Sequence, residues 1–178
     1  MRFTSDQSEV SAVILTGGNG SRFREGDGEK LPKQFAAAGG RPVFVHALEL
    51  YLNVEEVDKI YLVVNESYRH LYEAILERYG YSGTVTIVPG GQTRLRSVTN
   101  AIAHVPESGL TVVHNGASIL TDRDYIRRCI READKRGAVT GWMKPLHTVF
   151  ERSGDSVKRV LERSRLGYTC DPQVFSNG

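Results

Sequence analysis

The first apolar run of the chain leads into a glycine-rich loop, and a short basic motif follows it: Ala12-Val13-Ile14-Leu15-Thr16-Gly17-Gly18-Asn19-Gly20-Ser21-Arg22 and Leu31-Pro32-Lys33-Gln34. This order is typical of a buried strand that feeds a loop around phosphate groups. Glycines let backbone N–H groups approach anionic oxygens, and Arg22 and Lys33 supply the positive charge that a polyphosphate needs. The stretch predicts a nucleotide site, with a glycine-rich turn of no chemical role as the alternative.

Three common phosphate-binding loops do not match this stretch. A Walker A loop needs Lys and then Ser or Thr after its last glycine, whereas Gly20 is followed by Ser21 and Arg22. The dinucleotide fingerprint needs a third glycine where Phe23 stands, and Phe is too bulky for close packing of helix on strand. A kinase glycine loop requires His-Arg-Asp and Asp-Phe-Gly downstream, and the sequence contains neither.

Length and composition favour one globular domain. The chain has 178 residues, 40% of them hydrophobic and 25% charged, which is enough for a core. A formal net charge of +2 argues against a nucleic-acid or anionic-membrane partner. The first ten residues lack the blocks of a signal peptide, no apolar run approaches ~18 residues, and Cys129 and Cys170 have no metal or redox spacing. We expect a cytoplasmic protein that does not span a membrane.

Strand and helix patterns alternate along most of the chain. Strands are expected at 11–16, 58–65, 84–88, 110–114 and 138–142, and helices at 41–52, 67–79, 94–105 and 122–135. This alternation predicts an α/β fold with a single doubly wound, mostly parallel sheet. Because ligands of such sheets bind beyond the carboxyl ends of the strands, the loops at 16–20, 90–92 and 114–118 are expected to converge.

The alternation ends near residue 145. Residues 147–151 and 157–161 read as two short strands joined by a turn at 153–155, so 145–165 is predicted to be a β-hairpin arm. A hairpin that projects from an α/β domain buries little by itself, so we expect it to pack on a second subunit in a two-fold homodimer. The alternative is a flap folded onto the edge of its own sheet.

Several separated motifs resemble one known family. They are the loop at 15–22 with 31–34, Gly90-Gly91 through Arg94 to Ser97-Val98, Val113-His114-Asn115-Gly116-Ala117, Thr148, Leu161-Glu162-Arg163 and Asp171-Pro172-Gln173. In this order they resemble the cytidylyltransferases that make CDP-linked polyols. The resemblance covers nearly the whole chain, 1–178. It implies a glycosyltransferase-A-like nucleotidyltransferase domain, CTP as co-substrate with a divalent metal, usually Mg²⁺, and a hairpin arm that completes the partner's acceptor pocket.

The resemblance also implies a role for particular residues. The two catalytic cations would be Arg22 and Lys33. The triphosphate would lie on a loop formed by Thr16, Gly17, Gly18, Asn19 and Gly20. The cytosine pocket would be formed by Gly90, Gly91, Gln92 and Ser97. The phosphorylated acceptor would contact Asn115, Ser118, Thr148, Arg163 and Asp171.

The chain departs from the family pattern at the acceptor side. Where members usually have Asp-Ala-Ala-Arg-Pro, residues 115–119 read Asn-Gly-Ala-Ser-Ile, so Asn115 is left as a weak metal ligand. Asp171 stands where a threonine usually precedes Pro-Gln, which puts a negative charge near an anionic acceptor. Both changes suggest a different acceptor with the same nucleotide.

Members also usually continue beyond Pro-Gln with further helices and a strand. We therefore expect a trimmed domain of a longer or bifunctional protein, a site with replaced groups, or a degraded paralogue. The leading function is cytidylyl transfer to a small polyol phosphate. The alternatives are the same transfer to a hydroxyalkylphosphonate, a sugar-1-phosphate nucleotidyltransferase that uses UTP or another nucleotide, and a non-catalytic nucleotide-binding protein.

Overall fold

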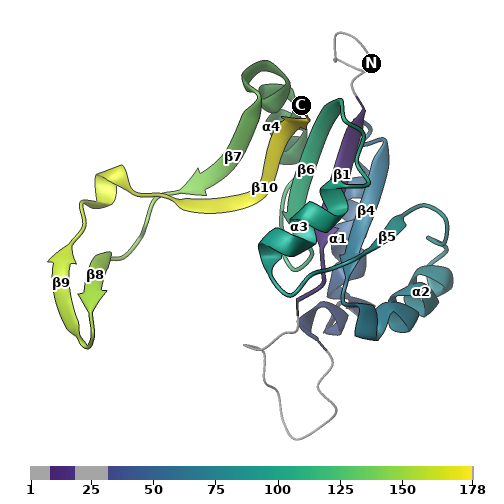
Figure 1. Ribbon diagram of the computed structural model, residues 1–178, viewed down its shortest axis with the longest axis horizontal. Coiled ribbons are helices and arrows are strands. Elements are labelled where there is room, and N and C mark those ends of the chain that lie inside the picture. Colours follow the sequence, from purple (N-terminus) through teal and green to yellow (C-terminus); the bar gives the residue numbers. More distant parts are fainter. Residues whose placement is uncertain (1–8, 19–31, 178) are drawn as a thin grey trace, which may run out of the picture.

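A six-stranded sheet forms the centre of the molecule. The computed structural model describes residues 9–18 and 32–177, and its strand order is β5-β4-β1-β6-β10-β7 (Figure 1). The strands are β1 (Val10–Leu15), β4 (Lys59–Val64), β5 (Thr86–Pro89), β6 (Gly109–Asn115), β7 (Ala138–Met143) and β10 (Tyr168–Asn177). The first four pair in parallel, and β10 is antiparallel to both of its neighbours. The predicted mostly parallel sheet is confirmed.

Helices cover both faces of this sheet. They are α1 (Val43–Leu52), α2 (Arg69–Arg78), α3 (Arg94–Ile102) and α4 (Arg123–Arg136). Because side chains alternate along a strand, Ala12 and Ile14 of β1 join a core with α1, α2 and α4, whereas Val13 joins a second core with Ala101 of α3. Figure 1 shows α3 alone in front of the sheet. The doubly wound arrangement is therefore confirmed, and within the described ranges no helix has the length and apolarity to cross a membrane.

Each helix and strand that was predicted begins and ends within three residues of the observed element. One difference has a clear physical cause and concerns the start of α1, which was expected at residue 41 and lies at Val43. Arg41–Pro42 instead form a two-residue strand, β3, which pairs with β2 (Ala37–Ala38). Pro42 has φ −57° and ψ 140°, so it precedes the helix in an extended conformation rather than occupying its first turn.

Strand β10 was not predicted from the sequence. Asp171 and Pro172 interrupt its apolar pattern, and its register on β7 shifts between Cys170 and Gln173. From Gln173 onward it pairs with β6 on one side and with β7 on the other, and its first half, from Tyr168 to Cys170, pairs with the end of β7. The strand thus lies between β6 and β7 and carries Asp171 toward the loop that follows β6.

The arm projects from the sheet as a two-stranded hairpin. Its strands are β8 (Phe150–Ser153) and β9 (Ser156–Val160), joined by a turn at Gly154, as predicted (Figure 1). The arm and its base expose large hydrophobic side chains, namely Trp142, Met143, Leu146, Phe150, Val157, Val160 and Tyr168. The hairpin does not fold back as a flap on its own sheet edge.

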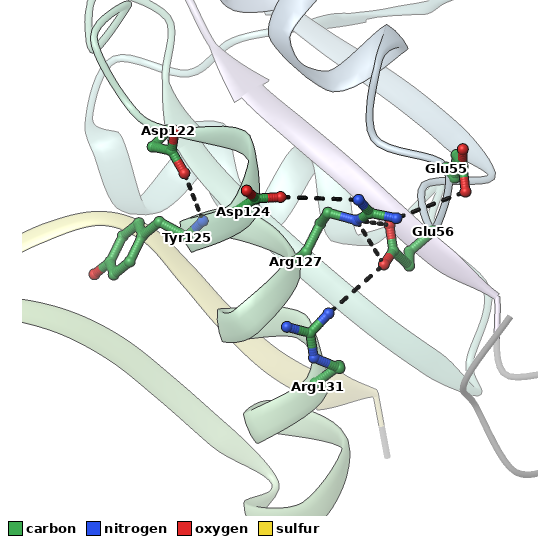
Figure 2. Close-up of polar contacts among 7 residues, drawn as sticks. All are labelled: Glu55, Glu56, Asp122, Asp124, Tyr125, Arg127 and Arg131. Carbon is green, nitrogen blue, oxygen red and sulfur yellow. Dashed lines mark hydrogen bonds and ion pairs between the residues drawn. The ribbon is translucent and has the colours of Figure 1, made fainter. Parts of the chain in front are cut away.

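Helix α4 is tied to the turn that precedes β4 by a group of ion pairs. Arg127 Nε donates to Glu56 Oε1 at 2.9 Å, and Arg127 also approaches Glu55 and Asp124 (Figure 2). Arg131 Nη1 lies 4.0 Å from the same Glu56 carboxylate. Arg127 and Arg131 are more than a third exposed, so solvent screening limits each of these pairs to about 0–1 kcal/mol.

Candidate functional site

Three loops lie side by side at the carboxyl-end edge of the parallel strands. Gly90, after β5, donates its N–H to the Val64 carbonyl at the end of β4, at 2.7 Å. A Cβ on Gly17, after β1, would lie 3.4 Å from the carbonyl carbon of the same Val64. Gly116, after β6, donates its N–H to the Leu15 carbonyl at 3.0 Å. The loops therefore meet at one edge, as the sequence predicted.

The end of β1 is held rigidly by buried polar groups. Thr16 is buried, and its Oγ1 donates to the Val63 carbonyl at 2.6 Å. The Thr16 carbonyl accepts from Gln34 Nε2 at 2.6 Å and from the Tyr72 hydroxyl at 2.9 Å. Gln34 Nε2 also donates to the Gly18 carbonyl at 3.1 Å. The strand end is thus fixed before any ligand binds.

The loop after β5 is built around Ser97. Ser97 lies within α3 and is 8% exposed, and its hydroxyl accepts the Gly91 N–H at 3.0 Å. A Cβ on Gly91 would lie only 2.4 Å from Arg96 Cβ, so this position requires glycine. Ser97 therefore holds Gly90–Gly91 against α3, and Gln92 follows as an exposed residue of the same loop. Contact of these four residues with a base stays a prediction.

The loop after β6 presents a polar cluster. The Asn115 side-chain oxygen accepts the Ala117 N–H at 3.1 Å, and Ser118 Oγ donates to Asp171 Oδ2 at 2.5 Å. The Ser118 contact joins the loop to β10, which brings together three of the five predicted acceptor residues. Contact of Asn115, Ser118 and Asp171 with an acceptor stays a prediction.

A buried pair of rings lies beneath this cluster. His114 and Tyr51 pack edge to face, with 5.1 Å between ring centroids. His114 Nε2 donates to the Ser118 carbonyl at 2.9 Å, because a carbonyl can only accept, so Nδ1 is the unprotonated nitrogen of the neutral ring. Burial lowers the pKa of His114, although the Ser118 hydrogen bond and the Asp171 charge oppose this. Burial, and then the Asp171 charge, raises the pKa of Tyr51 well above its usual value.

The predicted catalytic and arm residues fall in different places. Lys33 is exposed at the start of a 3-10 turn, η1 (Lys33–Phe35), directly before the buried Gln34. Arg22, Asn19 and Gly20 lie outside the described residues. The two predicted arm residues, Thr148 and Arg163, are both exposed. Arg163 Nη1 donates to the Leu146 carbonyl at 3.0 Å. Figure 1 shows the arm on the far side of β7 from β1 and β5, so within this chain the arm residues do not join the three loops.

Two positioning side chains were not identified from the sequence. Gln34 and Tyr72 both donate to the end of β1 from elsewhere in the fold. Gln34 belongs to the basic motif at 31–34, but a polar residue next to a lysine gives no sign in the sequence that it is buried. Tyr72 lies on the apolar face of α2, where an aromatic residue reads as core.

A mostly parallel α/β sheet with glycine loops gathered at the carboxyl ends of its strands defines this chain as an α/β protein with a candidate ligand site at that edge. Comparison with known proteins makes the class narrower. Residues 10–178 match the family described as IspD: 2-C-methyl-D-erythritol 4-phosphate cytidylyltransferase. The chain therefore belongs to this family of cytidylyltransferases, which are enzymes.

Relatives and solved structures agree with this assignment. The chain is 32% identical, over 165 residues, to the 2-C-methyl-D-erythritol 4-phosphate cytidylyltransferase of Bacteroides thetaiotaomicron, which covers 93% of this chain and 73% of the relative. The Porphyromonas gingivalis protein of the same name is 31% identical, with 92% and 71% covered. The crystal structure of 4-diphosphocytidyl-2C-methyl-D-erythritol synthase from Anaerococcus prevotii superposes with a TM-score of 0.79 at 25% identity, over 96% of this chain and 70% of that one.

Proposed function

We propose that this chain transfers the cytidylyl group of CTP to the phosphate of a small polyol phosphate and releases pyrophosphate. The observation that carries the proposal is the family match over residues 10–178, in a chain whose glycine loops meet at one edge of the sheet. The names of the relatives make 2-C-methyl-D-erythritol 4-phosphate the first acceptor to test.

In the proposed reaction, an oxygen of the acceptor phosphate attacks the α-phosphorus of CTP. A new P–O bond forms, and the bond to the β-phosphate oxygen breaks, so pyrophosphate leaves with its electron pair. The acceptor phosphate is already largely a dianion near pH 7, because its second pKa is about 6. The reaction therefore needs no general base, and the barrier lies in bringing two anions together.

Fixed positive charge is what this barrier requires. Lys33 begins η1 as an exposed cation next to the end of β1, and Arg22 is proposed as the second cation although it lies outside the described residues. A guanidinium can bind two phosphate oxygens at once, whereas an ammonium acts as a point charge that can follow the reacting group. Both would stabilise the charge that develops on the transferring phosphoryl and the pyrophosphate.

The described residues also bear on the proposed magnesium ion. Within residues 9–18 and 32–177, no three His, Cys, Asp or Glu side chains gather to hold a metal. Mg²⁺ in nucleotide sites is held by one or two protein oxygens plus substrate phosphates and water. The residues fit an ion held mainly by the triphosphate, with Asn115 as a weak ligand because its oxygen already accepts the Ala117 N–H. Bound in that way, Mg²⁺ would neutralise phosphate charge.

The acceptor would occupy the side of the site formed by Asn115, Ser118 and Asp171. Asp171 Oδ2 accepts from Ser118, which leaves Oδ1 able to accept from a hydroxyl of a polyol. Thr148 and Arg163 project on the arm, so we propose that they reach the acceptor of a partner subunit in a homodimer. The exposed apolar side chains of the arm support such an interface.

The reaction is tested by measuring pyrophosphate release with CTP, UTP, ATP and GTP against polyol phosphates and hydroxyalkylphosphonates. We expect release with CTP and a polyol phosphate. Lys33→Ala should lower kcat by roughly 10² or more, as does the loss of one preorganised donor, while Lys144→Ala, on an exposed residue next to the arm, should not. Pyrophosphate release that occurs only with a hydroxyalkylphosphonate would indicate the alternative acceptor, which the names of the relatives do not support. CTP binding without release on any acceptor would indicate a non-catalytic protein.

A further inference from the structure

The side chain of Gln34 has both of its amide protons committed to the end of β1. Gln34 is 2% exposed, and its Nε2 donates to the Thr16 carbonyl at 2.6 Å and to the Gly18 carbonyl at 3.1 Å. A carboxamide nitrogen has two protons, so these two bonds use its full donor capacity. A buried amide that binds two carbonyls of one glycine loop is a specific arrangement rather than a filler of the core.

The Tyr72 hydroxyl reinforces the same arrangement. It donates to the Thr16 carbonyl at 2.9 Å from helix α2. A tyrosine hydroxyl is protonated at neutral pH, and burial raises the pKa of Tyr72 further. The Thr16 carbonyl thus accepts two hydrogen bonds, one from Gln34 and one from Tyr72, and its direction is fixed.

The direction of this carbonyl decides where the next N–H points. A trans peptide unit is planar, and its N–H and C=O groups point in opposite directions. Because the Thr16 carbonyl is drawn toward Gln34 and Tyr72, the N–H of Gly17 points away from them. A Cβ on the next residue, Gly18, would meet none of the described atoms within 4 Å. The N–H of Gly17 is therefore turned away from the buried side chains of Gln34 and Tyr72.

Gln34 also connects this loop to the lysine proposed as catalytic. Lys33 and Gln34 are adjacent in the turn η1, and the next residue, Phe35, anchors the turn in the core. The Phe35 ring lies 4.6 Å from the Tyr72 ring and 5.8 Å from the Phe44 ring, centroid to centroid. The backbone of Lys33 is thus fixed to the end of β1 on one side and to the aromatic core on the other, while its side chain stays exposed.

We propose that Gln34 is a positioning residue for the nucleotide triphosphate. It holds the Thr16 and Gly18 carbonyls on the buried side, so that the Gly17 N–H can face the phosphates, and it ties the backbone of the adjacent Lys33 to the end of β1. The inference rests on the proposed function, because it assumes that the loop binds the β- and γ-phosphates of CTP. A residue that only filled the core would affect all ligands alike.

The test compares ligands that differ only in their phosphates. The affinities of CTP and CMP are measured by isothermal titration calorimetry for the wild type, Gln34→Met and Tyr72→Phe. Gln34→Met keeps the length of the side chain and removes both donors, and Tyr72→Phe removes one donor to the same carbonyl. We expect Gln34→Met to weaken CTP by roughly 10- to 100-fold and CMP by less than about 3-fold, with a smaller selective loss in Tyr72→Phe. The KM for the acceptor should not change.

Two outcomes would overturn the proposal. One is an unchanged CTP affinity, and the other is an equal loss for CTP and CMP, in whichever variant keeps the circular dichroism spectrum of the wild type. If the wild type binds CTP and releases pyrophosphate, either result rejects the role of Gln34 and leaves the proposed function standing. A wild-type chain that binds no CTP rejects both.

Discussion

A methyl group added at position 116 probes how closely the loop after β6 is packed on the end of β1. A Cβ on the buried Gly116 would lie 2.4 Å from Thr16 Cγ2 and 3.2 Å from the Leu15 carbonyl oxygen. The Gly116 N–H donates to this same carbonyl at 3.0 Å, so the loop cannot move aside without losing a backbone hydrogen bond. We expect Gly116→Ala to lower the free energy of unfolding by about 1–3 kcal/mol, the usual cost of overpacking.

A second substitution removes the atom that the new methyl would meet. Thr16→Ser deletes Cγ2 and keeps Oγ1, which donates to the Val63 carbonyl at 2.6 Å. Alone, the loss of this buried methyl should cost about 1 kcal/mol. In the double variant one methyl takes the place of another, and the closest remaining contact is the one at 3.2 Å to Leu15. The double variant should therefore be at least about 1 kcal/mol more stable than the sum of the two single losses predicts.

Urea unfolding of the four proteins, followed by circular dichroism, measures this coupling. Gly18→Ala is the matched control, because a Cβ on Gly18 would meet no atom of the described residues within 4 Å, and it should change the free energy of unfolding by less than about 0.5 kcal/mol. Additive losses in the double variant, or a Gly116→Ala protein as stable as Gly18→Ala, would show that the two loops are not in the contact described.

Three further predictions concern the acceptor side, pH and the arm. Asp171→Asn should raise the KM for the acceptor roughly tenfold and leave the KM for CTP unchanged, because an amide oxygen accepts a hydroxyl less strongly than a carboxylate does; an unchanged acceptor KM contradicts this. Burial lowers the pKa of His114, so the unfolded state takes up its proton first and stability should fall as the pH drops below about 6.5. Urea midpoints should show this slope in the wild type but not in His114→Asn, and equal slopes in the two proteins would be contrary evidence. Val157→Asp combined with Val160→Asp should give a monomer in analytical ultracentrifugation if the exposed face of β9 forms the dimer, and a dimeric double variant would exclude that face.

The order of strands and helices could be predicted because each element carries a strong local pattern. The continuous apolar run of β1 and the helical stripe of α4 each agree with their buried faces. Strand β10 was missed because Asp171 and Pro172 interrupt its pattern, and its place in the sheet is set by pairing with β6 and β7, which are far from it in sequence. Pairings of this kind depend on tertiary contacts that no short stretch contains.

The candidate site was predictable only in part, for a similar reason. Glycines such as Gly91 and Gly116 mark positions where the backbone of another element comes close, and the sequence singled out their loops correctly. The burial of Gln34 depends on the carbonyls at the end of β1, which a linear pattern does not display. Ser97 was predicted to contact the base, and the structure adds that its hydroxyl holds Gly91.

The most direct test of the proposed activity identifies both products of one reaction. The protein is incubated with CTP, Mg²⁺ and 2-C-methyl-D-erythritol 4-phosphate, and pyrophosphate and the organic product are quantified together by mass spectrometry. We predict pyrophosphate and a CDP-linked polyol in equal amounts, with CTP preferred over UTP, ATP and GTP. Pyrophosphate without the CDP-linked product, or neither product from a protein that binds CTP, would contradict cytidylyl transfer to a polyol phosphate.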